Sequence, residues 1–455
     1  MSNNRYGKRR RNRKKRKTLF VIEIVLLAVL VVVLFVSIWL TRKFSLINHT
    51  ELNKDNLYTS SEVNGTSSVA GGDTESSMSA ESASAYSGFE VIALVGIDTR
   101  DEMDGENSDT MILACINHNE KTIKLVSIYR DTMLNCGNDY YGNSDYYSKA
   151  NAAYNLGGPE QFLSMINLNL DLDVTEFATV GFNALSDTID LLGGIDVDLT
   201  YEEVVHLNNY NVETSAAVGV EYQALELPDS SEFYGAMTRT YHLSGSQAVS
   251  YARIRYTDGN DFRRAARQRL VLQKVMDGMK AAGIGTLNNI LNAVLPEVTT
   301  NIDNAKILSL AGTLISYNIT DQTGFPFSHI EDVVNDEDVV VPVTLAYNVQ
   351  QLHEWILPGS GYSPSGTVQE YSSRITALSG YGEESITLDA ENGEIPTWDS
   401  DLNDLAIQEQ AVGNSSASGY SSDDSSSYSS DYYDDNSYYE DDYYSDEYYD
   451  DAENY

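Results

Sequence analysis

The hydrophobic and polar positions divide the chain into segments of different character. An apolar run, Leu19–Leu40, contains a single charge, Glu23, and a long polar stretch without apolar periodicity follows it. From Phe89 onward, apolar positions recur at strand and helix spacing, and the last residues are almost entirely Ser, Asp and Tyr. The pattern predicts these segments: a transmembrane helix at 19–40, a flexible tether at 41–87, a folded domain at 88–375, a linker at 376–413 and a disordered tail at 414–455.

The apolar run has the length of a membrane span. At about 1.5 Å per residue it extends for about 33 Å, enough to cross a hydrocarbon core of ~30 Å. A cleaved signal peptide has a shorter apolar region and a small-residue cleavage site, whereas Thr41-Arg42-Lys43 follows here. The basic cluster Lys8–Lys17 precedes the run, so we expect residues 1–18 to be cytoplasmic and everything after Leu40 to be exported. The prediction is a single-pass signal anchor in the cell membrane.

The domain alternates strand-like and helix-like patterns. FEVIALVGID, MILACIN, KTIKLVSIYRD, IDVDLT and EDVVVPV are typical of strands, the second and third forming a hairpin at His118–Glu120. PEQFLSMINLNL, FNALSDTIDLLGG, DFRRAARQRLVLQKVMDGMKAA and Ile290–Leu314 have helical spacing. Tyr201–Tyr241 is polar and predicts an irregular excursion, and SGSQAVSYARIRY predicts a short helix followed by a strand. The expected fold class is α/β, with a central mixed sheet flanked by helices.

The charge distribution excludes one class of partner. Residues 1–17 hold ten of the 29 basic residues, so the other 19 face all 68 acidic ones and leave −49 on the rest of the chain. Such a balance repels nucleic acid, and the basic N-terminus beside a membrane span is typical of a topology signal with some affinity for anionic lipid. Cys115 and Cys136 are compatible with a disulfide or with two buried thiols.

Positive charges concentrate in one short segment of the domain. Six of the 19 exported basic residues are arginines between Arg253 and Arg269. Arg253 and Arg255 share one face if this stretch is a strand, and Asp261, Arg264 and Gln268 share one side of the following helix, next to Arg267. Guanidiniums bind phosphate oxygens bidentately, so the pattern predicts a phosphate pocket. A surface of helix ion pairs is the alternative, and it suits Arg263 and Arg269.

Two acids stand at the ends of apolar strands. Asp98 closes VGID and Asp109 precedes TMILA, which places both at the rim of the sheet. Two carboxylates together with substrate phosphates commonly hold Mg²⁺. The acids and the arginines together predict a site for a metal ion and a diphosphate. No HExxH, Walker loop, paired CxxC or Gly-x-Ser-x-Gly motif competes with this interpretation.

Seven blocks in order resemble a known family. VGIDTR, NSDTMIL, VSIYRDT, KANAAYNLGG, LLGGIDVDL, LSGSQAVSYARIRY and DFRRAARQ are similar to the LytR–CpsA–Psr family of Gram-positive bacteria, over residues 88 to 285 and less specifically to about 375. The resemblance implies a phosphotransferase that moves a glycopolymer, such as a teichoic acid or a capsular polysaccharide, from polyprenyl diphosphate to peptidoglycan through a phosphodiester. It also implies an apolar tunnel for the lipid, and it leaves a pyrophosphatase side activity open.

The resemblance assigns roles to matching positions. Asp98 and Asp109 would hold Mg²⁺, or Mn²⁺ in its place, and would be catalytic together with Arg130 and Arg255. Asp261 would hold an arginine or complete the metal shell. The implied diphosphate contacts are Arg100, Arg130, Lys149, Arg253, Arg255, Asp261, Arg264, Arg267 and Gln268.

The sequence departs from the family pattern at two places. Tyr129 stands where Pro is usual, and Ala152 stands where a His is usual, so the pocket wall should differ. A non-catalytic envelope protein that binds lipid-linked glycopolymer or cell wall is the alternative function, and it would tolerate loss of the two acids. A transcription regulator is disfavoured, because DNA would meet only the N-terminal basic run.

Overall fold

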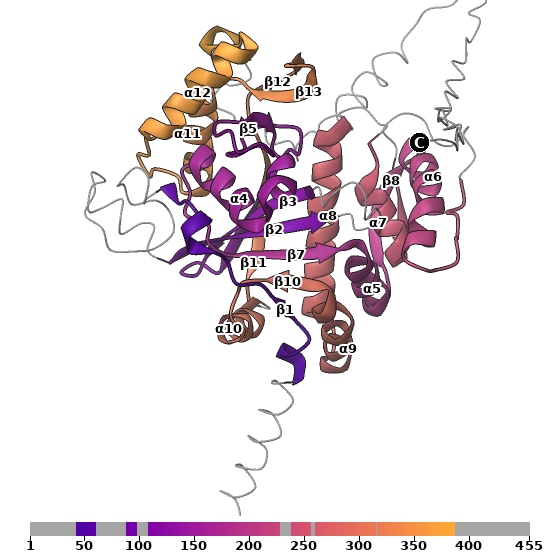
Figure 1. Ribbon diagram of the computed structural model, residues 1–455. Coiled ribbons are helices and arrows are strands. Elements are labelled where there is room, and N and C mark those ends of the chain that lie inside the picture. Colours follow the sequence, from indigo (N-terminus) through magenta and orange to yellow (C-terminus); the bar gives the residue numbers. More distant parts are fainter. Residues whose placement is uncertain are drawn as a thin grey trace, which may run out of the picture. The chain divides into compact units, whose positions relative to one another are not determined.

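A seven-stranded mixed sheet forms the centre of the domain (Figure 1). The computed structural model describes residues 42–60, 88–97, 108–227, 238–255, 260–314 and 316–386. The sheet has the order β1-β10-β7-β2-β3-β4-β11. Its strands are β1 (Asn48–His49), β2 (Phe89–Ile97), β3 (Ser108–Asn117), β4 (Thr122–Ile128), β7 (Phe177–Gly181), β10 (Val298–Thr300) and β11 (Asn318–Phe325).

The strand directions place several strand ends at one edge of the sheet. β3 is antiparallel to both β2 and β4, β7 is parallel to β2, and β11 is parallel to β4. The carboxyl ends of β2, β4, β7 and β11 therefore lie at one edge, which we call the carboxyl edge. The predicted mixed sheet and the β3–β4 hairpin are confirmed.

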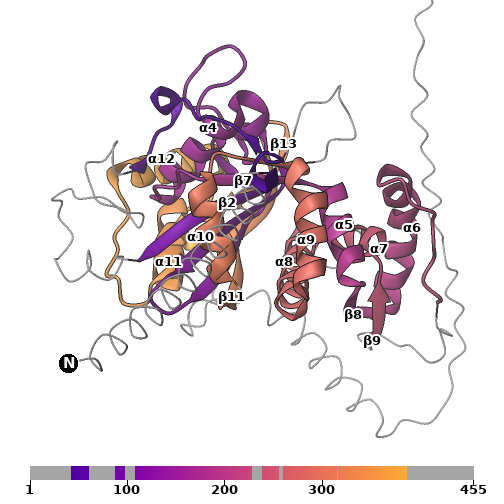
Figure 2. The same ribbon diagram turned by 90° about the horizontal axis from the view of Figure 1, so that it is seen from below.

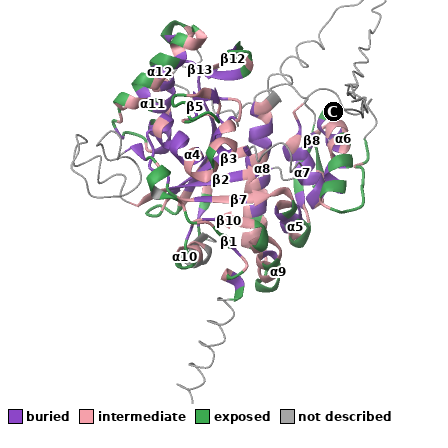
Figure 3. Ribbon diagram, in the orientation of Figure 1, coloured by how far each residue is buried: buried purple, intermediate pink, exposed green. Residues whose placement is uncertain are grey.

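Helices cover both faces of the sheet. On β2 the residues alternate, with Val91 and Val95 in the core under α4, α11 and α12, and Ile92 in the core under α8 and α10. Figure 3 shows the buried positions of the central strands in purple. Inside α4, Gly157 and Gly158 leave helical geometry, so the regular helix restarts at Pro159, as the sequence pattern predicts. The bounds are α4 (Ala152–Leu170), α8 (Asn260–Ala281), α9 (Ile284–Val294), α10 (Asn304–Leu314), α11 (Leu345–Ile356) and α12 (Gly366–Ser379).

A second core lies on the far side of α8 from the sheet (Figure 1 and Figure 2). It contains α5 (Phe182–Leu192), β8 (Ile195–Thr200), α6 (Tyr201–Ala217), β9 (Thr238–Leu243) and α7 (Gly245–Arg253). The irregular excursion predicted for 201–241 is wrong for 201–217, where Thr200 and Glu203 form a capping box that begins α6, and for 238–241, which belong to β9. Residues 218–227 are irregular as predicted. The remaining strands, β5 (Met133–Asn135) with β6 (Tyr147–Lys149) and β12 (His329–Val334) with β13 (Glu337–Pro342), form two hairpin-like pairs.

Part of the predicted tether is built into the fold. Residues 42–60 pack against the domain: β1 adds to the sheet beside β10, and Ser60 Oγ donates to Asp171 at 2.8 Å. The prediction of a flexible segment is therefore wrong for 42–60. Its polar residues carry no apolar pattern because they attach through backbone and side-chain hydrogen bonds. The domain also continues past 375, through α12 to Ser385, so the predicted start of the linker at 376 is wrong too.

Several predictions fall outside the described residues. They are the cytoplasmic segment 1–18, the membrane span 19–40, the rest of the tether 61–87 and the tail 414–455. In the part of the chain that is described, no helix is long and apolar enough to cross a membrane. Cys115 and Cys136 are buried free thiols, and burial raises the pKa of each to about 12.

Candidate functional site

The carboxyl edge brings three predicted positions to neighbouring strands. Asp98 directly follows β2, Asp109 lies near the start of β3, and Arg130 follows the end of β4. The register pairs Ile97 with Ser108, so the ends of β2 and β3 that carry the two acids are adjacent. Sequence reasoning from strand ends thus selects one edge of one sheet.

Asp261, in the first turn of α8, is the centre of a charged cluster. Its carboxylate accepts hydrogen bonds from Arg255 Nε at 2.8 Å, Arg264 Nη2 at 3.0 Å and Arg130 Nε at 3.2 Å. Arg264 is the predicted i, i+3 partner on the same helix. Two nearby arginines and one from a distant part of the sequence, Arg130, therefore aim their guanidiniums at one carboxylate.

Asp131 extends the cluster on the other side of Arg130. It forms ion pairs with Arg130 Nε and with Lys149 Nζ, both at 3.3 Å. Lys149 ends β6, which pairs with β5 directly after this segment. Four cationic side chains thus surround two carboxylates, so the cluster retains positive charge for an anionic ligand. We call these six residues the cationic cluster: Arg130, Asp131, Lys149, Arg255, Asp261 and Arg264.

The pKa values of the two carboxyl groups in the cluster shift in opposite directions. Burial alone would raise the pKa of Asp261, but Arg264, the hydrogen bonds with Asp131 and Arg255, and the charge of Arg130 lower it to about 2. Burial raises the pKa of Asp131, and the hydrogen bond with Asp261 raises it further. Asp261 is therefore the counter-ion that stays ionised, and of the two carboxyl groups Asp131 is the one that the raised pKa makes easier to protonate.

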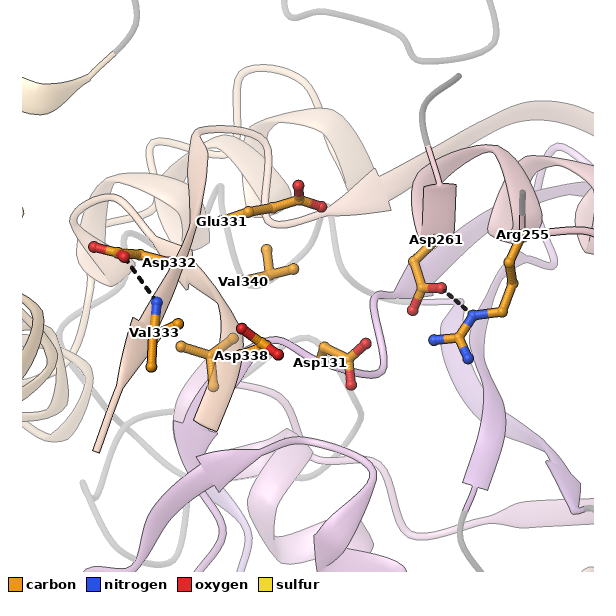
Figure 4. A pocket seen from close by; sticks show the side chains of 9 residues that line it. Asp131, Arg255, Asp261, Glu331, Asp332, Val333, Asp338 and Val340 are labelled. Carbon is orange, nitrogen blue, oxygen red and sulfur yellow. Dashed lines mark hydrogen bonds and ion pairs between the residues drawn. The ribbon is translucent and has the colours of Figure 1, made fainter. Parts of the chain in front are cut away.

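A pocket of about 610 Å³ opens beside the cluster (Figure 4). Asp131, Arg255 and Asp261 line one side of it, and β12 and β13 form the other. The side chain of Arg255 is 39% exposed, whereas that of Arg264 is 8% exposed. Arg255 is thus the guanidinium that a ligand in the pocket reaches first.

The opposite wall of this pocket is acidic. Glu331, Asp332 and Asp338 project from β12 and β13 and are exposed (Figure 4). The hairpin is joined to the cluster by the backbone, since Val340 N donates to Asp131 O at 2.8 Å. An anionic group is attracted to the Arg255 side and repelled by the β12–β13 side, so the pocket has one anion-binding end, at Arg255, and one acidic end suited to hydroxyl or cationic groups.

Tyr129, the residue in place of the usual proline, supports the cluster from inside. It is buried, and its ring centre lies 4.6 Å from that of Phe262 and 5.9 Å from that of His329. Tyr129 precedes Arg130 and Phe262 follows Asp261. The aromatic contacts therefore hold together the two chain segments that carry an ion pair of the cluster.

Two predicted diphosphate contacts lie elsewhere. Arg253 ends α7 rather than lying in a strand, and its guanidinium donates to Thr214 Oγ1 at 2.8 Å and Glu213 Oε2 at 3.2 Å on α6. The capping box at Ser244 starts a helix that continues through Arg253, so the prediction that Arg253 and Arg255 share a strand face is wrong. Arg267 is fully buried and pairs with Glu203 Oε1 at 3.0 Å.

The remaining predicted site residues are the other polar residues of α8, the expected metal ligands and Arg100. Arg269 is fully buried, so the alternative of a surface ion pair is wrong for it, while Gln268 and Arg263 are half-buried. Asp98 and Arg100 lie outside the described residues, and the side chain of Asp109 is not described. Among the side chains that are described, no group of three or more His, Cys, Asp or Glu residues is arranged to hold a metal.

The sequence prediction missed Asp131 and the acidic wall. Asp131 follows Arg130 at a strand end, the same signal that selected Asp98 and Asp109, so the sequence carried enough information to include it. Glu331, Asp332 and Asp338 are ordinary hairpin acids in the sequence. Their place in the pocket depends on the attachment of the hairpin to residues 131–132, which no local pattern reveals.

The fold and site define an α/β protein with a cationic cluster at the carboxyl edge of its sheet, an arrangement suited to phosphate-bearing ligands. The family model described as the LytR_cpsA_psr family matches residues 56–351, which is more than half of the chain. The chain therefore belongs to the LytR_cpsA_psr family, and the resemblance seen in the sequence is confirmed.

Curated relatives match over part of their length. Polyisoprenyl-teichoic acid–peptidoglycan teichoic acid transferase TagV of Bacillus subtilis is 30% identical over 208 residues, covering 45% of this chain and 47% of TagV. Biofilm regulatory protein A of Streptococcus mutans is 28% identical over 219 residues, covering 47% and 50%. The teichoic acid transferase TagU of Bacillus cereus is 29% identical over 223 residues, covering 48% and 62%. The chain thus spans less than two thirds of each of these relatives.

Among solved structures, protein gbs0355 from Streptococcus agalactiae is similar with a TM-score of 0.50. The match has 23% sequence identity and covers 62% of this chain and 92% of that one. At this level of identity the similarity concerns the fold alone.

Proposed function

We propose that this chain is a membrane-anchored phosphotransferase of the cell envelope. It moves a glycopolymer phosphate from a polyprenyl diphosphate carrier to a hydroxyl of peptidoglycan: a phosphodiester forms, the bridging P–O bond of the diphosphate breaks, and polyprenyl phosphate leaves. Residues 19–40 anchor it in the cell membrane with the described domain outside. The names of TagV and TagU, which act on teichoic acid and peptidoglycan, support this class of donor and acceptor.

The observation that carries the proposal is the cationic cluster beside the pocket. A polyprenyl diphosphate presents two linked phosphates, and Arg255, Arg264 and Arg130 present planar donors that already converge on the Asp261 carboxylate. A phosphate oxygen that replaces part of this pairing meets donors held in place before the ligand arrives. Such preorganisation is the main way in which proteins stabilise phosphoryl transfer.

The backbone of β2 and β3 is compatible with a divalent cation at this edge. The pairing of Ile97 with Ser108 puts the positions of Asp98 and Asp109 on adjacent strand ends, and carboxylate oxygens are the donors that Mg²⁺ prefers. Mg²⁺ held there, or Mn²⁺ in its place, would neutralise part of the diphosphate charge.

Two residues that line the pocket have separate roles in the proposed reaction, one in binding the donor and one in accepting a proton. Arg255, the most exposed guanidinium of the cluster, binds and orients the diphosphate at the anion-binding end. Asp131, whose pKa burial and Asp261 raise, lines the same pocket and is placed to accept the proton of an incoming sugar hydroxyl. Water in place of that hydroxyl gives hydrolysis of the donor as a side reaction.

The test is transfer by the full chain in vesicles that contain a polyprenyl-diphosphate-linked glycopolymer, with peptidoglycan as the acceptor. Arg255→Ala and Asp109→Ala should each lower the rate by about 10²–10³-fold, the cost of removing one donor to a developing charge. Arg263→Ala, next to Arg264 on α8, is the matched control and should keep the wild-type rate. Near-wild-type rates for both site variants contradict the proposal, and a non-catalytic binder predicts that Asp109→Ala still binds the donor.

A further inference from the structure

The first described residues attach the start of the domain to one helix. Lys43 is buried, and its Nζ donates to Asn288 O of α9 at 3.3 Å and to the Asn292 side chain. Asn48 Nδ2 donates to Pro296 O, just after α9, at 2.8 Å. These contacts fix residues 42–48 against α9 and the segment that follows it.

The described chain therefore meets α9 only three residues after the end of the predicted membrane span. Leu40 is two residues before Arg42, and two residues of extended chain span at most about 7 Å. If residues 19–40 cross the bilayer, as the proposed function requires, α9 lies at the bilayer surface. The distance leaves no room for a long flexible spacer at this point.

The composition of α9 fits such a position. Residues 281–296, AAGIGTLNNILNAVLP, contain no charged side chain, although 21% of the whole chain is charged. Within α9 Ile290 is the buried residue, and Ile284 is 88% exposed. A stretch without charge that also exposes an isoleucine is unusual on a strongly acidic domain, and because it carries no acidic side chain it is not repelled by anionic lipid headgroups.

The same region lies at the edge of the sheet that carries the cationic cluster. β10 is antiparallel to β7 and β1 is parallel to β10, so both begin at the carboxyl edge. β4, whose end leads to Arg130, is four strands along from β10, an offset on the order of 20 Å at ~4.8 Å per strand. A membrane surface at α9 would thus be near the site on the same side of the sheet.

We propose that residues 42–47 and 281–296, which we call the α9 surface, contact the lipid of the membrane in which the chain is anchored. The uncharged helix meets the interfacial region of the bilayer, and Arg42 faces the lipid headgroups. The proposal rests on the anchorage part of the proposed function and not on the transfer reaction. Its consequence is that the domain has one fixed orientation on the membrane, with the carboxyl edge toward the lipid that carries the donor.

Fluorescence quenching in vesicles tests the α9 surface. The full chain is reconstituted with an environment-sensitive thiol probe at Ile284→Cys or, as the matched control, at Val333→Cys on β12, where the native side chain is 59% exposed. Cys115 and Cys136 are buried with pKa values raised to about 12, so they stay unlabelled. Nitroxide-labelled lipids should quench the probe at 284 strongly and the probe at 333 weakly. Equal quenching at the two positions overturns the proposal.

Two further measurements separate this proposal from the transfer reaction. Carbonate extraction tests the anchor: a chain that is removed from the vesicles overturns the anchorage and the α9 surface together. Introducing Asn289→Asp, at an exposed position of α9, into the probe variant adds a charge to the surface without touching the Lys43 contacts, and quenching at 284 should fall toward the level at 333. Arg255→Ala should lower the transfer rate by about 10²–10³-fold without changing quenching, so failure of the activity and failure of the surface give different results.

Discussion

Two ion-pair groups in this molecule are built from the same short run of arginines and differ in what surrounds them. In the cationic cluster, Asp261 meets three guanidiniums, and the side chain of Arg255 is 39% exposed beside a pocket. Three residues beyond Arg264, Arg267 has no exposed surface and meets Glu203 in the second core. The cationic cluster is open to a ligand, and we call it the open group. The pair of Arg267 with Glu203 is enclosed by protein, and we call it the closed group.

The difference teaches that arginine density alone does not define a site. Arg267 has its donors taken up inside the protein, by Glu203 Oε1 and by Ile254 O, both at 3.0 Å. It joins α6, α8 and the end of α7. Arg255 has a carboxylate partner on one side and an opening on the other, so a phosphate can replace or extend its pairing. The density of arginines in the sequence points to both ion-pair groups, and the exposed fraction of each side chain distinguishes the ligand site from the buried pair.

The largest expected loss of stability comes from a substitution that breaks the closed group. Arg267→Met removes the partner of Glu203 and leaves a buried carboxylate uncompensated, which should lower the free energy of unfolding by about 3–5 kcal/mol. Arg255→Met should change it by no more than about 1 kcal/mol, since its pair is partly exposed. Chemical denaturation of the two variants measures both values.

The double variant Arg267→Met with Glu203→Gln is the control. If the loss comes from the orphaned charge, the second substitution should restore part of the stability. A stability loss for Arg255→Met as large as that for Arg267→Met would contradict the distinction between an open and a closed group.

The same contrast explains what could be predicted from the sequence. The helix α8 follows from its apolar spacing, and the Asp261–Arg264 pair follows from a separation of three residues. Assigning Arg267 to the pocket was wrong because its partner, Glu203, belongs to a helix that the polar composition of 201–217 concealed. Local periodicity locates an element but not the distant residue that it buries.

The prediction for the N-terminal segment, residues 42–60, was wrong for a different physical reason. β1 is a two-residue strand, and residues 42–60 contact the domain through bonds such as that from Asn53 N to Glu160 Oε1 at 2.9 Å. Attachment of this kind uses polar groups, so a polar sequence does not distinguish it from a flexible linker. The core strands β2–β4 were predictable because apolar burial imposes a pattern, whereas hydrogen-bonded docking imposes none.

An intermediate effect concerns the pH dependence of the open group. The pKa of Asp261 is lowered to about 2, so its ionised form stabilises the fold above the ordinary carboxyl range, and this stabilisation is lost as pH falls from about 4 through about 2. Asp261→Asn should remove this contribution, on the order of 2 kcal/mol, and flatten the acid side of the stability curve. Denaturation of both proteins between neutral and acidic pH measures it. Parallel curves for wild type and Asp261→Asn would show that another carboxyl group is responsible.

The smallest expected change in stability is that of Lys149→Ala, which should also shift the pH dependence of transfer. Lys149→Ala removes an ion pair in which the lysine side chain is 30% exposed, so unfolding should change by about 0.2–1 kcal/mol. The positive charge of Lys149 opposes the influences that raise the pKa of Asp131, namely burial and Asp261. Without the lysine, that pKa should rise further, and the acid limb of transfer should move to higher pH because Asp131 must be ionised to accept a proton. Lys149→Arg keeps the charge and should leave the limb in place. An unchanged acid limb in Lys149→Ala would exclude Asp131 as the group that receives the proton.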